Sequence, residues 1–167
     1  MMSLLPVPAE VLAVFRRFRT AEFSTIAKDG TPIAWPVTPL YQEDSGAFIT
    51  STSIGLPNKA FNIRRNPRVA LLFSEPKASG LPAAPAVLVQ GQAQVDDTIT
   101  TLAGLEALWE KIYRFQPPSS QISSSPLSRY LMDWYYMRLR VVTVPQRIAW
   151  WPKGDFSQPP EVVANVG

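Results

Sequence analysis

Residues 50–73 read TSTSIGLPNKAFNIRRNPRVALLF, and this stretch decides the fold. It predicts a strand ending in hydroxyl residues, a loop with Gly and Pro, a short helix that begins at Pro57 and ends at Asn66, and an apolar return strand. Hydroxyl groups at a strand end and free N–H groups at a helix N-terminus donate hydrogen bonds to phosphate oxygens, and Lys59 adds a positive charge. The stretch therefore favours an anion site, although an ordinary polar turn with a solvated lysine explains it about equally well.

The segments before this stretch predict one helix and three strands. Apolar residues recur at helical spacing over residues 8–19, which indicates an amphipathic helix. Residues 23–28 and 31–41 are β-prone and flank an Asp-Gly dipeptide, a strong hairpin signal. A further turn precedes a strand at 47–52, so we expect the three strands to follow one another as an antiparallel meander.

The segments after it predict three more strands and two helical segments. The expected elements are strands at 68–74, 86–95 and 138–151, a helix at 101–115 and a helical turn at 126–134. Gly91 is expected to mark a bulge or a close backbone approach. In the short helix after Pro57, we expect Ala60, Phe61 and Ile63 to pack inward. Residues 158–167 are expected to form a flexible tail.

These elements predict one α+β, mainly β, domain that spans residues 1–167 and is built on about six antiparallel strands. The 167 residues include no Cys and no His. This composition excludes disulfides, thiolate nucleophiles and imidazole bases, and we expect no metal site. Asp96, Asp97 and Glu75 lie beside turn signals, so no catalytic carboxylate is assigned. The remaining chemistry is that of a bound cofactor.

Composition also limits the expected partners and compartment. The formal net charge of +3 is weak support for an anionic partner, and we expect no nucleic acid because the aromatic residues fall mostly within apolar runs. No apolar stretch approaches the roughly 20 residues that span a bilayer, so no membrane is expected. A chain without Cys needs no oxidising compartment, and its start lacks the pattern of a secretory signal, so we expect a cytoplasmic protein.

Several segments resemble the pyridoxamine 5'-phosphate oxidase-like family. The run NKAFNIRRNPRVALLF carries a Lys, a short helix with an Asn, an Asn-Pro turn and an apolar strand in the family's order. FSTIAKDGTPIAWPVTPLY resembles the family's first hairpin, AVLVQGQAQVDD a later strand, and VVTVPQRIAWWP its closing strand. The resemblance covers most of residues 15–153. It implies a split β-barrel that dimerises and holds FMN in a groove between two subunits.

The resemblance also implies positions for the cofactor. Trp35, Pro36, Val37 and Thr38 would line the edge of the isoalloxazine ring. Thr50, Ser51, Thr52 and Lys59 would face the ribityl chain and phosphate, Gln90 or Gln92 would approach the ring, and Trp150 and Trp151 would close the site. Large aromatic residues more often fill a core or an interface, so for at least one tryptophan we rate interface packing above contact with flavin. The family often places a basic residue near the phosphate in the second strand, where this chain has WPVTPLY, and Arg64 or Arg65 could substitute.

These residues favour an FMN-dependent oxidoreductase that acts on a small molecule, with the flavin transferring the electrons. True pyridoxamine phosphate oxidases hold their substrate with His and Arg, so a chain without His is not expected to have that activity. The alternatives are a deazaflavin-dependent reductase and a flavin- or haem-binding sensor or stress protein without turnover. We expect a homodimer, because the apolar strand at 141–151 and the open sheet edges would otherwise stay exposed.

Overall fold

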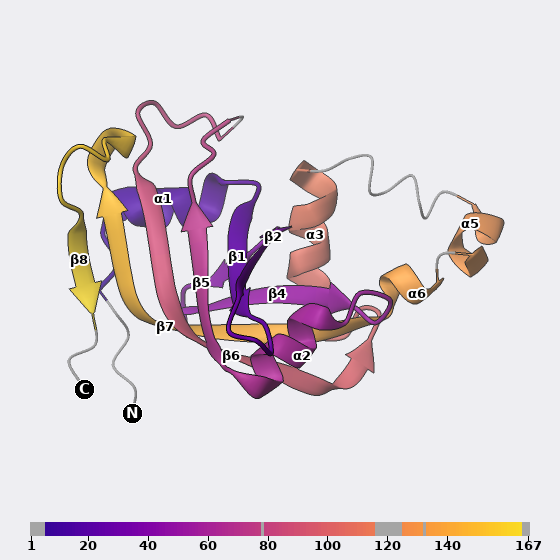
Figure 1. Ribbon diagram of the computed structural model, residues 1–167. Helices are drawn as coiled ribbons and strands as arrows, with labels where there is room; N and C mark the ends of the chain where they lie inside the picture. Colours follow the sequence, from indigo (N-terminus) through magenta and orange to yellow (C-terminus); the bar gives the residue numbers. More distant parts are fainter. Residues whose placement is uncertain (1–5, 78, 116–124, 132, 165–167) are drawn as a thin grey trace.

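The computed structural model describes residues 6–77, 79–115, 125–131 and 133–164. In this part of the chain, eight antiparallel strands form one sheet in the order β2-β1-β5-β6-β7-β4-β3, and β8 pairs with β7 (Figure 1). The strands are β1 Ala21–Ile26, β2 Pro32–Val37, β3 Leu40–Gln42, β4 Ala47–Ser53, β5 Arg68–Phe73, β6 Ala86–Thr100, β7 Arg138–Trp151 and β8 Glu161–Ala164. The prediction of an α+β split barrel is confirmed.

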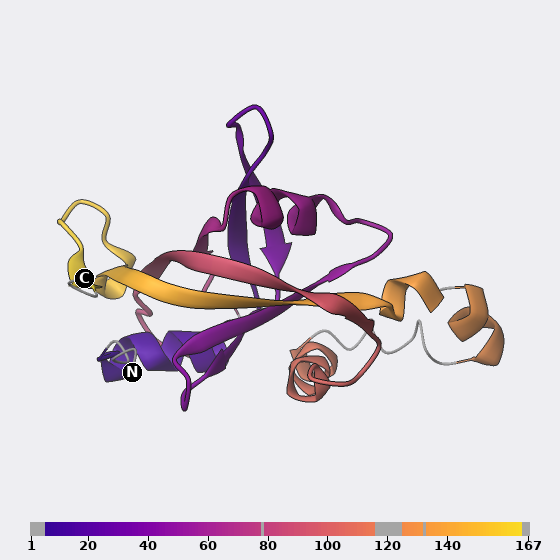
Figure 2. The ribbon, with the colours of Figure 1, turned by 90° about the horizontal axis from the view of Figure 1, so that it is seen from below.

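Helices lie around the sheet rather than within it (Figures 1 and 2). They are α1 Ala9–Arg17, α2 Asn58–Arg65, α3 Glu106–Phe115, α5 Pro126–Leu131, α6 Asp133–Tyr136 and the 3-10 turn η1 Pro152–Gly154. Figure 2 shows the two longest strands, β6 and β7, running together across the molecule, with α1 near one end and α5 and α6 at the other. No helix of the described residues is long and apolar enough to span a membrane.

The barrel closes at the short link between β2 and β3. These two strands lie at opposite ends of the sheet order, yet only Thr38 and Pro39 separate them. The two pairings of the expected meander are present, β1 with β2 and β3 with β4, but the single strand expected over residues 31–41 is wrong because it forms two strands. Pro36 and Pro39 have no backbone N–H for a strand ladder, which explains why the extended segment at 31–41 divides in two. The link draws the two sheet edges together and places Thr38 at the junction.

The barrel core is aromatic and begins at α1. Its residues Val11, Val14 and Phe15 are buried, as the helical spacing predicted. The ring of Phe15 packs edge-on against Phe48, with 4.8 Å between the ring centroids, and tilted against Phe73 at 5.1 Å. Aromatic pairs in such geometries add roughly 0.5–1.5 kcal/mol to the stabilisation from buried area. This core fixes the barrel wall against which α2 and α3 pack.

Gly91 lies at a register shift between β6 and β7, as predicted. Gln90 pairs with Arg147 and Gly91 with Pro145, so one residue of β7 is skipped. A Cβ atom at Gly91 would lie 2.1 Å from the carbonyl oxygen of Val144, closer than any side chain could approach. The glycine is required because the two backbones approach closely at this point.

Three other expectations are corrected. Residues 101–104 are not helical, since α3 begins at Glu106, and Leu102 is 56% exposed. Phe61 is 50% exposed, because Asn62 takes the inward position beside Ile63. Part of the expected tail is a strand, since β8 pairs with β7 over four residues.

Candidate functional site

A cavity of about 280 Å³ lies at the barrel junction. Its lining comes from the segment before β1, the end of β2 with its link to β3, strand β4, helices α2, α3 and α6, and the first residue of β7. The lining residues are Thr20, Pro36, Val37, Thr38, Ser51, Lys59, Ile112, Tyr135 and Arg138. Five of the residues predicted from the sequence meet here: Pro36, Val37, Thr38, Ser51 and Lys59.

Of the three predicted hydroxyl residues Thr50, Ser51 and Thr52, Ser51 lines the cavity, because side chains alternate between the two faces of a strand. Successive side chains of a strand point to opposite faces, so Thr50 and Thr52 share the inner face with buried Phe48. Thr50 is fully buried, and Thr52 donates a 3.0 Å hydrogen bond to the carbonyl oxygen of Leu56. Ser51 lies on the other face and lines the cavity. The structure does not bring Thr50 and Thr52 to the cavity.

Lys59 is the second residue of α2 and reaches the cavity from a half-buried position. Its ammonium lies 5.9 Å from the ring centroid of Phe23 in β1. Burial, with a further contribution from the positive charge of Arg138, lowers the pKa of Lys59 from 10.5 to about 8. No carboxylate of the described residues forms an ion pair with Lys59.

Arg138 is the second cation of the cavity, and sequence reasoning missed it. Its Nε donates a 2.8 Å hydrogen bond to the carbonyl oxygen of Tyr135. The guanidinium lies 4.4 Å from the Tyr135 ring centroid and 5.1 Å from that of Trp109, within cation–π range. These contacts hold the side chain in one orientation. Arg138 pairs with Ser53 across β4 and β7, a long-range register that local patterns do not encode.

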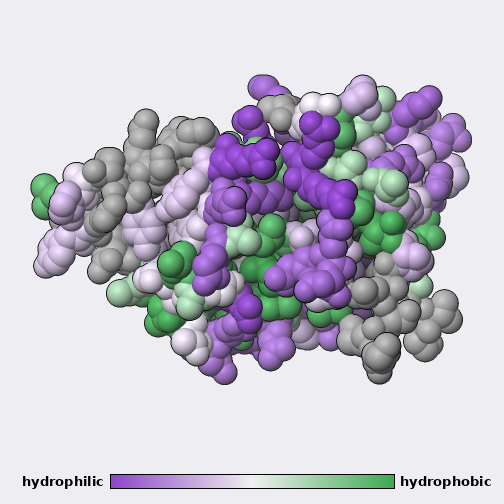
Figure 3. All heavy atoms as spheres, turned by 180° about the vertical axis from the view of Figure 1, so that it is seen from behind, coloured by the Kyte–Doolittle hydropathy of each residue, from purple (hydrophilic) through white to green (hydrophobic). Residues whose placement is uncertain are grey.

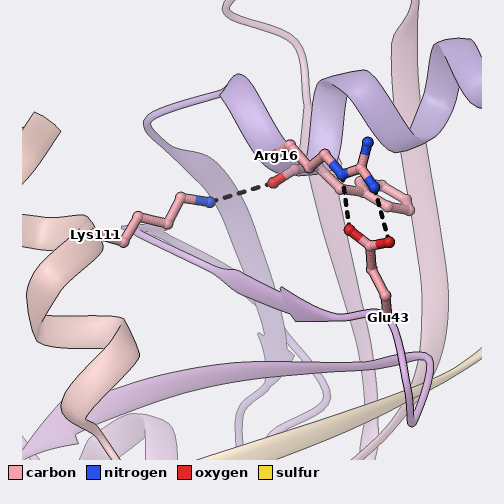
Figure 4. A network of polar contacts seen from close by, with 4 residues as sticks. Arg16, Glu43 and Lys111 are labelled. Carbon is pink, nitrogen blue, oxygen red and sulfur yellow. Dashed lines mark hydrogen bonds and ion pairs between the residues drawn. The ribbon is translucent and has the colours of Figure 1, made fainter.

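Helix α3, which contributes Ile112 to the lining, is held in place by its buried residue Lys111 (Figure 4). The Lys111 ammonium donates hydrogen bonds to the carbonyl oxygens of Phe15, at 3.2 Å, and Pro39, at 2.5 Å. Burial lowers the pKa of Lys111 to about 8. The nearby Arg16–Glu43 ion pair joins α1 to the turn between β3 and β4. Lys111 thus ties α3 to α1 and to the link that closes the barrel.

The other predicted site residues do not line this cavity. Trp35 packs half-buried against the core, and its indole nitrogen has no hydrogen-bond partner among the described residues. Gln90 and Gln92 are exposed on β6, where Gln90 accepts a 2.7 Å hydrogen bond from Arg147. Trp150 is buried and donates a hydrogen bond to Glu10, while Trp151 packs on Phe156.

Distance along β7 separates Trp150 and Trp151 from Arg138. The strand has 14 residues, and at about 3.3 Å per residue its two ends lie roughly 40 Å apart along the chain. Within one subunit, the tryptophans and the cavity therefore occupy opposite ends of the sheet. Strand β7 also lies between β6 and β4, so it is not the exposed strand from which the sequence analysis expected a dimer.

The cavity has the chemistry of a phosphate site. Two cations, Lys59 and Arg138, line it together with apolar groups and the hydroxyl groups of Thr20, Thr38, Ser51 and Tyr135, and no carboxylate of the described residues does. Burial and, to a smaller extent, repulsion from Arg138 lower the pKa of Lys59, and an anion would relieve that repulsion. Hydroxyl groups and cations are the ordinary donors to phosphate oxygens in proteins.

A comparison with protein-family profiles identifies one family. Residues 7–138 match the sequence profile described as pyridoxamine 5'-phosphate oxidase, which is well over half of the chain. No curated protein matches the sequence.

Solved structures with the same fold differ in what they are described to bind. A pyridoxamine 5'-phosphate oxidase-related, FMN-binding protein from Nostoc punctiforme matches with a TM-score of 0.63 and 14% identity, covering 100% of both chains. An F420 reductase matches with a TM-score of 0.59 and 20% identity, over 85% of this chain and 98% of that one. A heme-binding protein from Mycobacterium smegmatis matches with a TM-score of 0.54 and 18% identity, over 95% of this chain and 59% of that one. At these identities the similarity establishes the fold alone.

Proposed function

The chain belongs to the pyridoxamine 5'-phosphate oxidase family, and on that premise we propose that its cavity binds the phosphate end of FMN in a flavin-dependent oxidoreductase. The observation that carries the proposal is that Lys59 and Arg138 line one cavity to which no described residue contributes a carboxylate. A dianionic phosphate would meet both charges there. The cavity is about 280 Å³, so it suits the phosphate end, and the ring system would extend beyond it.

The charged, hydroxyl and apolar residues of the lining have different parts in this proposal. Lys59 and Arg138 neutralise the phosphate, and Arg138 is held ready for it by Tyr135 and Trp109. The hydroxyl groups of Ser51 and Thr20 donate hydrogen bonds to phosphate or ribityl oxygens. Apolar groups of Val37 and Ile112 exclude water, which strengthens each charged contact.

The bound flavin would supply the transfer of a hydride or of single electrons, and the protein would supply binding, orientation and electrostatics. This division suits a chain that has no Cys or His. A small organic molecule is the proposed substrate. The missing imidazole argues against the pyridoxamine phosphate oxidase reaction itself.

A homodimer is part of the proposal. Large apolar side chains are exposed in the described part of the chain, among them Leu56, Phe61, Ile99 and Leu102. Figure 3 shows apolar patches between polar residues on one face of the molecule. Exposed apolar patches of a soluble fold are typical of interfaces. A partner subunit would cover such a patch and would bring its Trp151, Gln90 or Gln92 toward the ring system, whereas Trp150 is buried in its own subunit.

A deazaflavin cofactor is the second candidate, and the F420 reductase with the same fold supports it. A haem-binding or flavin-binding protein without turnover is the third, supported by the heme-binding protein of the same fold. The absorption spectrum of the purified protein, followed by titration with FMN, a deazaflavin and haemin, separates the three. We expect saturable binding of FMN in preference to the others. Preference for haemin or the deazaflavin would replace FMN, and binding of none would remove the proposal.

A further inference from the structure

The buried amide of Asn62 is a polar group close to the cavity that does not line it. Asn62 lies in α2, three residues after Lys59, and only 5% of it is exposed. Its Nδ2 donates a 3.0 Å hydrogen bond to Oγ1 of Thr25 in β1, and its Oδ1 accepts a 2.6 Å hydrogen bond from Arg65. A buried amide must be paired in this way, because an unpaired polar group in the core costs free energy. Unlike apolar packing, such a bond is directional.

Lys59 and Asn62 lie against neighbouring residues of the same strand, β1. The ammonium of Lys59 lies 5.9 Å from the ring centroid of Phe23, and Asn62 bonds to Thr25, two residues further along β1. Phe23 and Thr25 are both buried on the inner face of the strand. Residues three apart share a face of a helix, just as residues two apart share a face of a strand. The Asn62–Thr25 hydrogen bond therefore fixes how α2 is rotated about its axis and how far along β1 it lies, and this determines the position from which the Lys59 side chain extends.

We propose that Asn62 is a positioning residue for the anion site: its hydrogen bond to Thr25 holds α2 in the register that brings Lys59 to the cavity. This inference rests on the proposed function, because the anion that Lys59 serves there is the flavin phosphate. Asn62 acts only through Lys59. Its loss should therefore affect ligands with a phosphate and spare the same ligand without one.

A double-mutant cycle tests this dependence. Wild type, Asn62→Leu, Lys59→Met and the double variant are titrated with FMN and with riboflavin, which lacks the phosphate. We expect Asn62→Leu to lower the affinity for FMN roughly tenfold and the affinity for riboflavin less than about twofold. In the Lys59→Met background, Asn62→Leu should change FMN affinity less than about twofold. Equal weakening of both ligands, or an undiminished effect without Lys59, would make Asn62 a general structural residue and overturn the proposal.

A second variant keeps the test decisive if Asn62→Leu does not fold. That substitution leaves the Thr25 hydroxyl buried without its partner, whereas adding Thr25→Val replaces both partners by apolar groups, a nearly neutral change. The combined Thr25→Val and Asn62→Leu protein should fold and show the same selective loss of FMN affinity. If it keeps the wild-type preference for FMN, the proposal is wrong.

Asn66→Ala is the matched control, because Asn66 lies just after α2 and its side chain bonds to Arg68 and not to β1. We expect this variant to bind both flavins as wild type does. If wild type binds neither flavin, the proposed function itself fails. If wild type prefers FMN and the Asn62 variants do too, only the positioning role fails.

Discussion

Lys59 and Arg138 line the same cavity from distant parts of the chain, and the charge of Arg138 adds to burial in lowering the pKa of Lys59 to about 8. The two cations destabilise each other while no anion is present. A phosphate between them would convert this repulsion into two attractive contacts, each a charge-assisted hydrogen bond worth about 1.5–3 kcal/mol.

FMN affinity should fall as the pH rises through 8. Lys59 is about nine-tenths protonated at pH 7 and about one-tenth protonated at pH 9, given a pKa of about 8. Because only the ammonium attracts phosphate, we expect FMN affinity to fall roughly severalfold to tenfold between these pH values at constant ionic strength. Lys111 has a similarly lowered pKa, so Lys59→Met, which retains Lys111, is the control. A slope of the same size in that variant would assign the pH dependence to another group.

Arg138→Gln should weaken FMN binding about tenfold, since it removes one of two charges facing the phosphate. It should also raise the pKa of Lys59 by removing the neighbouring positive charge, so the pH at which FMN affinity falls should move upward. Isothermal titration at several pH values measures both effects. Arg147→Gln is the matched control, because Arg147 lies further along β7 and pairs with Gln90. Equal losses in the two variants would indicate a general effect of net charge.

Ser51→Ala and Thr52→Ala should differ, although the two residues are adjacent. Ser51 lines the cavity, and its loss should weaken FMN about threefold to tenfold, in line with one hydrogen bond to a charged group. Thr52 faces the barrel interior and bonds to Leu56, so its replacement should lower the unfolding temperature while leaving FMN affinity nearly unchanged. Titration and thermal unfolding of both variants test this. If Thr52→Ala weakened FMN binding and Ser51→Ala did not, the face of β4 that carries Thr52, and not the face that carries Ser51, would contact the ligand.

The protein should be a dimer in solution when flavin is bound. Light scattering at micromolar concentration should give twice the mass of one chain, because a partner would cover the exposed apolar side chains. A monomer mass with flavin present would contradict a groove shared between two subunits. The single-subunit cavity around Lys59 would then be the whole site.

The local part of this fold could be predicted from the sequence. Pro57 and Asn66 bound α2 to within one residue, and Gly91 marks the register shift between β6 and β7. Both features could be predicted because each is encoded by residues that are close together in the sequence. The division of residues 31–41 into β2 and β3 could not be predicted in the same way. Each piece pairs with a strand next to it in the sequence, but the two pieces lie at opposite ends of the sheet order because β1 pairs with β5 and β4 with β7, which are distant parts of the chain.

The residues of the site also fall into two groups: those that the local sequence predicts, and those that reach the cavity through contacts between distant segments. Lys59 and Ser51 belong to one continuous motif, so their proximity could be expected. Arg138, Tyr135 and Ile112 reach the cavity only because β7 pairs with β4 and α3 is tethered through Lys111. Because side chains alternate along a strand, Ser51 lines the cavity while Thr50 and Thr52 lie on the other face of β4. The cofactor contacts of these residues stay a prediction.

Titration of wild type and Lys59→Met with FMN and riboflavin tests the central claim most directly. The substitution keeps the aliphatic stem, and without ligand its unfolding temperature should be unchanged or slightly higher, because a partly buried charge beside Arg138 is removed. Wild type should bind FMN more tightly than riboflavin, and Lys59→Met should weaken FMN roughly tenfold to a hundredfold while sparing riboflavin. Lys77→Met, at an exposed position, should change neither affinity. Unchanged FMN affinity in Lys59→Met, or no preference of wild type for FMN over riboflavin, would contradict a phosphate site at this cavity.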